Sequence, residues 1–354
     1  MRFDAAALGA WAIDVAEAVG WSRVDAEEIV GNLLWADRRG IASHGLVRLP
    51  VYVQRAQAGG IDPRAVPEVS ERTPGVALVD GRHAAGQVSA AAAVHEAAER
   101  ARRLGIGAAW VRNGNHFGAA GYYGECLARD GFAGYVMCST DAVMSPPGGT
   151  RATVGTNPIC LFAPPAAPDQ PVPMVDMATS AVAYGKVIVA SRQGTRIPLG
   201  WGVDAKGRDT DDPRAVLDGG TILGVGGYKG FGLSFMIDVI GGAVGGASTG
   251  PRIGAYLGDA ATPQRLSHVI IAAAVGTIDP DGAYAARLAT LAEDVHANPR
   301  SPVAAGNPMI PGEPEWRASR RDPAGVTVDD RTAADLEELG RTLGCAPMPK
   351  GRDE

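Results

Sequence analysis

The stretch SHGLVR, residues 43–48, holds residue types that can bind and protonate a small carboxylic acid. The imidazole of His44 can give or take a proton near pH 7, and the planar guanidinium of Arg48 matches a carboxylate. The two residues are four apart, so they can share one helical face or one wall of a loop. The spacing alone also allows a purely structural reading, with Ser43 as a helix cap, His44 packed and Arg48 on the surface.

Two further polar residues stand where α/β proteins often bind ligands. His116 lies in NGNHFG, between a predicted strand and a predicted helix, and the flanking glycines leave backbone N–H groups open to a ligand. Asp176 ends the apolar strand in VDMATS, and strand ends are frequent ligand positions. The alternatives are a turn histidine bonded to a carbonyl and an aspartate that caps the next helix.

The segment GGYKGFGLSFMIDVIGG, residues 226–242, places Lys229 among glycines at the start of an apolar helix. An unobstructed helix N-terminus with a nearby lysine can bind an anion, although the spacing fits neither the dinucleotide fingerprint nor the P-loop. A solvated lysine at a tightly packed helix is the alternative. The i, i+3, i+4, i+7 spacing of the apolar residues predicts that the helix is amphipathic and buried through Leu233, Met236, Ile237 and Ile240.

The composition excludes several classes of protein. The chain has 354 residues, 46% hydrophobic and 20% charged, and its net charge of −6 argues against a nucleic-acid partner. It shows no signal-peptide core and no apolar run of about 18 residues that would predict a membrane helix. Four cysteines without paired spacing favour a reducing compartment, so we expect a cytoplasmic protein. His44, His116 and Asp176 could converge, but no local spacing requires a metal ion and none is predicted.

The apolar patterns predict an α/β fold with helices at both ends of the chain. Asp25 and Glu28 resemble a capping box that opens the second helix. Pro-rich pieces at 164–173 and 298–314 are expected to be loops. Helices are predicted at 4–19, 25–39, 49–58, 87–104, before Arg129, and at 181–192, 283–296 and 333–343. Strands are predicted at 75–81, 105–111, 132–139, 157–163, 172–178 and 268–275.

Six segments occur in the order and spacing of one family: SHGLVRLPVYV, GNHFGAAGYY, VGTNPI, DMATS, GGYKGFGLSFMIDVI and PGEPE. Over nearly its whole length the chain resembles the malate/L-lactate (L-sulfolactate) dehydrogenase family of NAD(P)-dependent oxidoreductases, which includes ureidoglycolate, diketogulonate and cyclic-ketimine enzymes. The resemblance implies a homodimer with a non-Rossmann, mixed-sheet α/β fold whose helical N- and C-terminal elements pack together. It divides the chain into a helical domain with the substrate loop, residues 1–75 plus 315–354, and a mixed α/β cofactor-binding region, residues 76–314.

The resemblance also implies an activity and a set of site residues. Hydride is expected to pass between NAD or NADP and C2 of a small 2-hydroxy or 2-keto acid. His44, supported by Ser43, is expected to exchange the proton of the substrate oxygen, although in some members the histidine matching His116 has that role. Expected substrate contacts are Arg48, which would hold the carboxylate, with Thr156, Tyr184 and Gly185. Expected cofactor contacts are His116, Phe117, Gly118, Ala119, Ala120, Thr140, Asp176, Met177, Ala178, Tyr228, Lys229, Pro311, Gly312 and Glu313.

One position departs from the cyclic-ketimine reductases that the chain resembles. Those enzymes carry an aspartate after His-Gly, which completes a Ser-His-Asp relay, whereas this chain reads Tyr184-Gly185-Lys186. A lysine cannot accept the imidazole N–H as a carboxylate does. We therefore expect a keto or hydroxy acid substrate, with NADPH-dependent reduction of a cyclic imino acid as the alternative.

Overall fold

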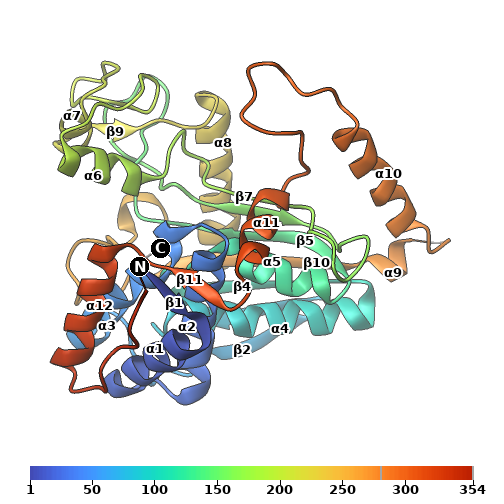
Figure 1. Cartoon of the computed structure of the whole chain (residues 1–354), viewed down its shortest axis with the longest axis horizontal. Coiled ribbons are helices and arrows are strands. Elements are labelled where there is room, and N and C mark those ends of the chain that lie inside the picture. The colour runs from blue at the N-terminus through green and yellow to red at the C-terminus, as the bar shows by residue number, and fades with distance from the viewer. Residues whose placement is uncertain (280, 353–354) are drawn as a thin grey trace.

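A mixed seven-stranded sheet forms the centre of the molecule, in a computed structural model that describes residues 1–279 and 281–352 (Figure 1). Only β3 and β4 pair in parallel, and the other neighbours are antiparallel, so the predicted mixed-sheet α/β fold is confirmed. Across the sheet the strands are β2 (Glu68–Thr73), β3 (Val76–Asp80), β4 (Ile106–Gly114), β10 (Leu266–Ala274), β5 (Phe132–Cys138), β6 (Ile159–Phe162) and β7 (Met174–Met177).

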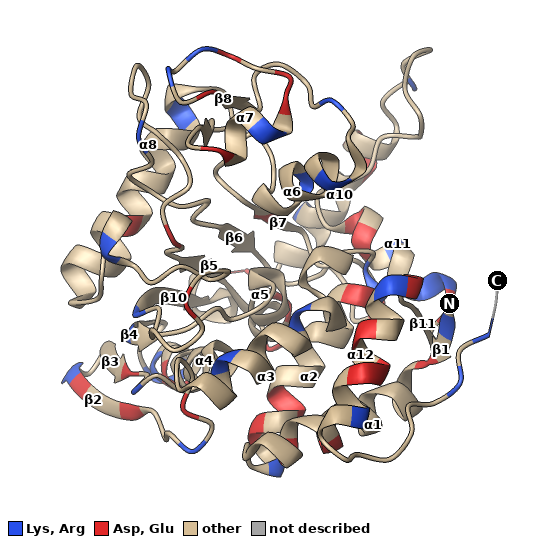
Figure 2. Cartoon of the chain, turned by 90° about the vertical axis from the view of Figure 1, so that its left-hand side faces the viewer, with Lys and Arg blue, Asp and Glu red and all other residues tan. Residues whose placement is uncertain are grey.

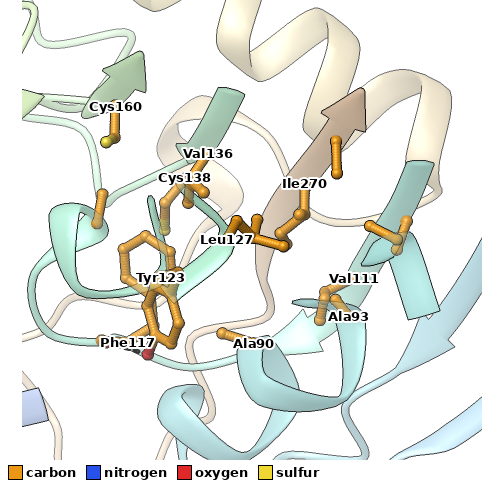
Figure 3. Close-up of a cluster of buried hydrophobic side chains, with 14 of the residues drawn as sticks. Ala90, Ala93, Val111, Phe117, Tyr123, Leu127, Val136, Cys138, Cys160 and Ile270 are labelled. Atoms are coloured by element: carbon orange, nitrogen blue, oxygen red, sulfur yellow. Dashed lines mark hydrogen bonds between the residues drawn. The ribbon is translucent and has the colours of Figure 1, made fainter. Parts of the chain in front are cut away.

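Helices α4 (Gly86–Leu104) and α5 (Ala120–Arg129) cover one face of this sheet. The alanine-rich side of α4 lets the helix backbone come close to the strands. Leu127 of α5 lies beside Ile270, and Tyr123 of the same helix packs on Phe117 (Figure 3). Each fully buried side chain of leucine or phenylalanine size contributes about 1.5–3 kcal/mol. This core fixes the ends of β4 and β5, from which the loops of the site emerge.

The opposite face of the sheet is only partly covered. Helix α8 (Tyr228–Ile237) and the π-helical turn η3 (Asp238–Ala243) pack on it through Ile237, which is 3% exposed. Leu233 and Met236 are 45% and 47% exposed, so the prediction that both are buried is wrong for the single chain. The reason is that only one side of α8 meets the sheet, and its other apolar side faces outward.

The two ends of the chain form a second hydrophobic core, so the predicted packing of N- and C-terminal elements is confirmed. Strand β1 (Arg2–Asp4) pairs antiparallel with β11 (Gly325–Thr327). The helix after residue 20 begins two residues earlier than predicted, because the Ser22 side chain accepts from the N–H of Asp25 and caps it. The helices of this core are α1 (Ala5–Val19), α2 (Arg23–Arg38), α3 (Leu49–Ala58) and α12 (Asp330–Thr342).

A third group of elements lies beyond β7, around a small core that includes Met144 and Val187 (Figure 1). Helix α10 (Tyr284–His296) extends away from the body of the molecule, and none of its residues is buried. Helix α11 (Glu313–Arg321) was not predicted, because its start lies in a proline-rich piece. The elements of the described chain not yet named are α6 (Tyr184–Gln193), β8 (Gly202–Val203), α7 (Pro213–Leu217), β9 (Thr221–Ile222), η4 (Gly250–Arg252) and α9 (Val275–Ile278).

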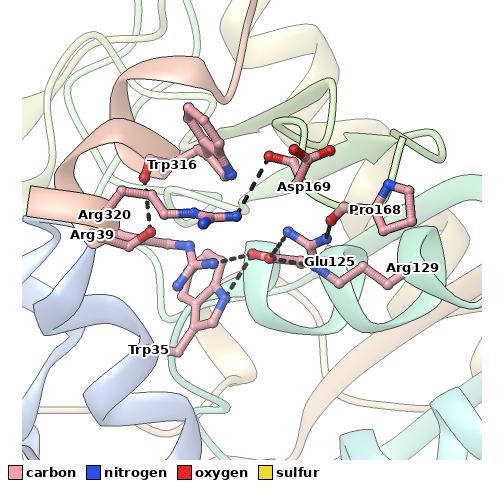
Figure 4. Close-up of polar contacts among 9 residues, drawn as sticks. Trp35, Arg39, Glu125, Arg129, Pro168, Asp169, Trp316 and Arg320 are labelled. Carbon is pink, nitrogen blue, oxygen red and sulfur yellow. Dashed lines mark hydrogen bonds and ion pairs between the residues drawn. The ribbon is translucent and has the colours of Figure 1, made fainter. Parts of the chain in front are cut away.

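A polar cluster joins α2, α5 and the region of α11 (Figure 4). Glu125 forms ion pairs with Arg39 and Arg129 and accepts the indole N–H of Trp35 at 2.9 Å. The Arg39 guanidinium lies 4.2 Å from the Trp35 ring centroid, and Arg320 of α11 donates to a backbone carbonyl nearby. The paired charges compensate one another, and the cluster links α2, in the core formed by the two ends of the chain, to α5, which packs on the sheet.

Charges of both signs are interspersed over the elements seen in Figure 2. Within the described residues, no helix combines the length and apolar character needed to cross a membrane. Cys126, Cys138, Cys160 and Cys345 are free thiols. The domain boundaries given above stay a prediction.

Candidate active site

The stretch SHGLVR folds into two short 3-10 turns, η1 (Ala42–His44) and η2 (Leu46–Arg48), with Gly45 between them. The Ser43 hydroxyl lies 2.9 Å from Nδ1 of His44. Nε of Arg48 donates to the backbone oxygen of Ser43 at 2.6 Å, which ties the second turn to the first. The structure therefore brings Ser43, His44 and Arg48 together as the sequence predicted.

His116, which follows β4, lies beside this pair. The His44 and His116 rings have centroids 5.7 Å apart, and the His116 ring stacks at 4.5 Å on Tyr256. The N–H of Gly118 donates to Nδ1 of His116 at 3.3 Å, so this nitrogen is an acceptor, and the Tyr52 hydroxyl donates to it at 2.7 Å. The proton of a neutral His116 ring is therefore on Nε2, which can donate to a substrate oxygen.

Helix α3 supplies three polar residues to this region, Arg48 at its N-cap and Tyr52 and Arg55 within it, at i, i+4 and i+7. The Arg48 guanidinium lies 5.3 Å from the Tyr256 ring centroid. Arg55 is buried and holds the loop that carries Tyr256, because its guanidinium donates to the carbonyl oxygens of Ala255, Tyr256, Asp259 and Thr262.

The sequence analysis missed Tyr52, Arg55 and Tyr256. The spacing of Tyr52 and Arg55 from Arg48 along the predicted helix was a usable signal for the first two. Tyr256 is more than two hundred residues away in the chain and had none.

Both histidines are held in their neutral form. Burial, followed by the charge of Arg48, lowers the pKa of His44 to about 4. Burial and then the neighbouring His44 and Arg48 hold the pKa of His116 well below its usual value. A substrate carboxylate bound to Arg48 would offset the charge of Arg48 and thereby favour protonation of His44.

A buried carboxyl joins this cluster to the next strand end. Asp141 follows β5 and accepts the backbone N–H of Tyr256 at 3.3 Å, while burial raises the pKa of the Asp141 carboxyl.

The residues predicted to meet the cofactor form a second group along the ends of β5, β6 and β7. Oδ2 of Asp176 accepts the N–H of Gly121, in the first turn of α5, at 2.7 Å. Desolvation of the carboxyl group by the surrounding protein raises the pKa of Asp176 to about 6, although part of the residue is exposed. The carbonyl oxygen of Pro311 accepts the N–H of Met174 at 3.1 Å, which sets the 311–313 segment beside β7.

Thr140 and Thr156 connect this group to α8. The N–H of Thr156 donates to Oγ1 of Thr140 at 2.9 Å, and its carbonyl accepts the N–H of Thr179, just after Met177 and Ala178, at 2.8 Å. The carbonyl of Thr179 in turn accepts the N–H of Val225, close to the start of α8, at 2.9 Å. Segments far apart in the sequence thus converge at one end of the sheet.

The start of α8 has the properties of an anion site. Gly226 and Gly227 have positive φ angles of 60° and 67°, which glycine adopts at no steric cost, and both are exposed. Tyr228 and Lys229 occupy the first helical turn, and both are exposed. Backbone N–H groups at a helix N-terminus, a lysine and the carboxylate of Asp176 are together a donor and acceptor set that fits the pyrophosphate and ribose of a dinucleotide.

Other predicted contacts lie elsewhere. Residues 117–120 are buried beneath His116, and Asn32 bonds to the carbonyls of Phe117 and Ala119, so this stretch supports His116 and a direct cofactor contact stays a prediction. Gly312 packs against β7, and Glu313 is buried, with its carboxylate held by His296 and Arg317 of its own chain.

Tyr184 and Gly185 are half-buried at the start of α6, with Lys186 exposed beside them. Burial, followed by the charge of Asp141, raises the pKa of Tyr184, and its contact with substrate stays a prediction. Across residues 1–279 and 281–352, no three His, Cys, Asp or Glu side chains gather closely enough to hold a metal ion.

This arrangement can bind a carboxylate, deliver or accept a proton next to it, and hold an anionic dinucleotide nearby. The sequence profile of the malate/L-lactate dehydrogenase family matches residues 3–337. Malate dehydrogenase of Pyrococcus abyssi is 39% identical over 68% of this chain and 68% of that protein. The Δ1-pyrroline-2-carboxylate/Δ1-piperideine-2-carboxylate reductase of Pseudomonas putida is 34% identical over 90% of this chain and 91% of that protein. Among solved structures, sulfolactate dehydrogenase of Methanocaldococcus jannaschii has a TM-score of 0.88 at 30% identity, with 98% of each chain covered.

Proposed function

Since the chain belongs to the malate/L-lactate dehydrogenase family, we propose that the cluster of Arg48, His44 and His116 binds and protonates its substrate. The protein is an oxidoreductase that transfers hydride between a nicotinamide cofactor and C2 of a small 2-hydroxy or 2-keto acid. The residue assignment rests on one observation: a guanidinium suited to a carboxylate adjoins two imidazoles whose centroids are 5.7 Å apart. A 2-oxo acid carries its carboxylate and its reacting oxygen on neighbouring carbons, which matches this pair of functions.

In the proposed reaction Arg48 holds the carboxylate with the terminal nitrogens of its guanidinium, while Nε keeps its bond to the backbone of Ser43. His44 protonates the 2-oxygen during reduction and takes the proton back during oxidation. Ser43 bonds to Nδ1 of His44, which orients the ring and leaves Nε2 for the substrate. Nε2 of His116 donates a hydrogen bond to the same oxygen, in a ring orientation fixed by Tyr52.

A bound nicotinamide supplies or accepts the hydride. We assign its binding to the start of α8 and to the exposed end of β7. Lys229 and the first N–H groups of α8 would neutralise the pyrophosphate, and Asp176 would accept from ribose hydroxyls. Thr140 and Thr156 lie between this region and the histidines, and so would border the reacting end of the cofactor.

The keto or hydroxy acid is favoured over a cyclic imine by the surroundings of His44. Among the described residues, Arg48 is the charged neighbour that lowers the pKa of His44, after burial. Lys186, which is exposed, occupies the sequence position at which the cyclic-ketimine reductases that this chain resembles carry the relay aspartate. Cyclic imino acid reduction is the second candidate, because a reductase of that class is among the relatives. Both substrates carry the carboxylate that Arg48 would bind.

A panel of 2-keto acids and five- and six-membered cyclic imine carboxylates, assayed separately with NADH and NADPH, tests the proposal. We expect a higher kcat/KM for a 2-keto acid than for either imine. A clear preference for an imine would establish the second candidate, and the absence of turnover with both classes would refute the assignment. The same panel selects the cofactor.

We also propose that two copies associate through the uncovered face of the sheet. Tyr135 and Leu161 are directly opposed on β5 and β6 and are 46% and 39% exposed. Helix α10 carries an apolar stripe at Leu288, Leu291 and Val295, with Leu291 61% exposed, and it extends from the body without burying any residue (Figure 1). One chain thus offers both an unpartnered sheet face and an unpartnered helix, so a second copy can cover each in a two-fold exchange.

Light scattering after size exclusion tests this association. The wild-type protein should have twice the chain mass, whereas Leu291→Asp and Tyr135→Asp should be monomers. Leu104→Asp is a matched control, because Leu104 is 51% exposed at the end of α4 and lies outside the proposed interface. A monomeric wild-type protein would refute the homodimer, and a dimeric Leu291→Asp would remove α10 from the interface.

A further inference from the structure

The segment that carries His44 and Arg48 has one internal side-chain tie between its two turns, the bond from Nε of Arg48 to the backbone oxygen of Ser43. Its two 3-10 turns, η1 and η2, have no side-chain caps of their own. Single 3-10 turns are weakly stable, and Gly45 between them lacks the side chain that would restrict its backbone. A contact from outside the segment would therefore add to the Arg48–Ser43 bond in fixing the separation of His44 and Arg48.

Asp37, in the last turn of α2, makes that contact. Its Oδ2 accepts the backbone N–H of Leu46 at 2.8 Å. A side-chain carbon added to Gly45 would lie 1.7 Å from Oδ1 of Asp37, so the carboxylate rests directly against the Gly45 backbone. The contact occurs at the hinge between the two turns.

The position of Leu46 lets this one hydrogen bond orient residues on both sides of it. Leu46 is the first residue of η2, which continues directly into α3, so the Asp37 carboxylate caps a helical run from 46 to 58 with a charge that favours a helix N-terminus. His44 is two residues before the capped N–H and Arg48 two residues after it. One hydrogen bond thus orients both residues of the proposed substrate site.

The ionised form of Asp37 carries a cost to stability. Burial raises the pKa of Asp37 to about 7, the Leu46 bond opposes that shift, and the charge of Asp329, at the start of α12, adds to it. A buried carboxylate beside another acid destabilises the folded chain when it ionises.

From this geometry we infer that Asp37 is a positioning residue, which holds His44 and Arg48 at the spacing that the substrate requires. The inference rests on the proposed function of those two residues. Asp37 touches neither substrate nor cofactor in this scheme and acts through the backbone of Gly45 and Leu46.

Two substitutions at Asp37 separate a positioning role from a general structural one. Asp37→Ala removes the acceptor for Leu46, so the KM for the best 2-keto acid of the panel should rise and kcat should fall, together by on the order of ten- to a hundred-fold in kcat/KM. The cofactor dissociation constant, measured by nicotinamide fluorescence, should not change. Asp37→Asn keeps an oxygen that can accept the Leu46 N–H, and it should recover most of the lost activity.

Glu28→Ala is the matched control, because Glu28 is a second buried carboxyl on α2 whose pKa is also raised to about 7 and whose partner is Tyr122. The inference is overturned if Asp37→Ala keeps wild-type kinetics, if Asp37→Asn is as impaired as Asp37→Ala, or if Glu28→Ala is equally impaired.

Hydrogen exchange of the peptide that covers Leu46 gives a readout independent of activity. Asp37→Ala should lose protection there, and Asp37→Asn should retain it. If Asp37→Ala loses protection but the wild-type protein turns over no substrate of the panel, the proposed function is refuted while the Asp37 contact is established. Unchanged protection would refute the positioning role itself. If Asp37→Ala does not fold, Gly45→Ala tests the same contact with Asp37 in place, and normal kinetics there would also overturn the inference.

Discussion

Replacing Arg48 with methionine should alter substrate binding and the ionisation of the histidines at the same time. The substitution keeps much of the apolar stem and removes the charge that lies 5.3 Å from the Tyr256 ring centroid. A hydrogen bond to a charged group contributes about 1.5–3 kcal/mol, which corresponds to about ten- to a hundred-fold in affinity. We therefore expect the KM for the 2-keto acid to rise by that factor, with a smaller loss of kcat because a loosely held substrate is misaligned.

The second consequence concerns pH. The charge of Arg48 is one of the causes, after burial, that lower the pKa of His44 to about 4. Without that charge the pKa should rise, although burial still holds it below its usual value. Oxidation of the 2-hydroxy acid needs neutral His44, so the acid limb of its kcat/KM profile should move to higher pH in Arg48→Met.

Steady-state kinetics in both directions between pH 4.5 and 9, at saturating cofactor, measure both effects. Arg192→Met, at an exposed arginine of α6, is the control and should match the wild type. An unchanged KM would remove Arg48 from the carboxylate site. A raised KM with an unmoved acid limb would show that Arg48 binds substrate but that His44 is not the titrating base.

Four further variants test the remaining assignments and one pKa shift. His44→Ala should lower kcat by about 10²–10⁴-fold and leave cofactor binding intact; if His116→Ala alone abolishes turnover, the acid–base role belongs to His116. Lys229→Ala should raise the cofactor dissociation constant by about ten- to a hundred-fold, and an unchanged constant would identify Lys229 as an ordinary surface charge. Burial raises the pKa of Glu28 to about 7, so the folded state keeps a proton that the unfolded chain releases near pH 4, and stability is lost as the pH rises through about 7. Glu28→Gln should therefore raise the free energy of unfolding at pH 8 by on the order of 1–3 kcal/mol but not at pH 4, and equal effects at both would contradict the shift.

Local patterns predicted most of the regular elements. The helix at residues 49–58 has the predicted bounds, because a proline near its start and Gly59 after its end are strong helix signals. The start of α2 was misplaced because Asp25 is an acceptor in a capping turn that Ser22 opens. Helix α11 was missed because its prolines resemble a loop, although a proline in the first turn is compatible with a helix.

Site residues that are close together in one sequence segment could be predicted, whereas those that only the fold brings to the site could not. Ser43, His44 and Arg48 are close in sequence and in space, so their types and spacing indicated a possible site, and the family resemblance supplied their roles. Asp37 is only nine residues before Leu46 but belongs to another element, and Tyr256 is more than two hundred residues away, so no helical or strand periodicity links either residue to this segment. The exposure of Leu233 likewise could not be predicted, because helical periodicity gives the apolar side of a helix but not how much of it a neighbour covers.

The single face of α3 that carries Arg48, Tyr52 and Arg55 has a consequence for how this site tolerates change. In the proposed site, successive turns of this helix hold the substrate carboxylate through Arg48, orient His116 through Tyr52 and hold the Tyr256 loop through Arg55. A small rotation or shift of that helix displaces all three contacts together, so they cannot vary independently. Substitutions at Tyr52 and Arg55 should therefore be non-additive with substitutions at Arg48, and a double-mutant cycle should give coupling energies of about 0.5–3 kcal/mol. In homologous chains that bind the substrate differently, we would then expect the residues at all three positions of this helix face to change together.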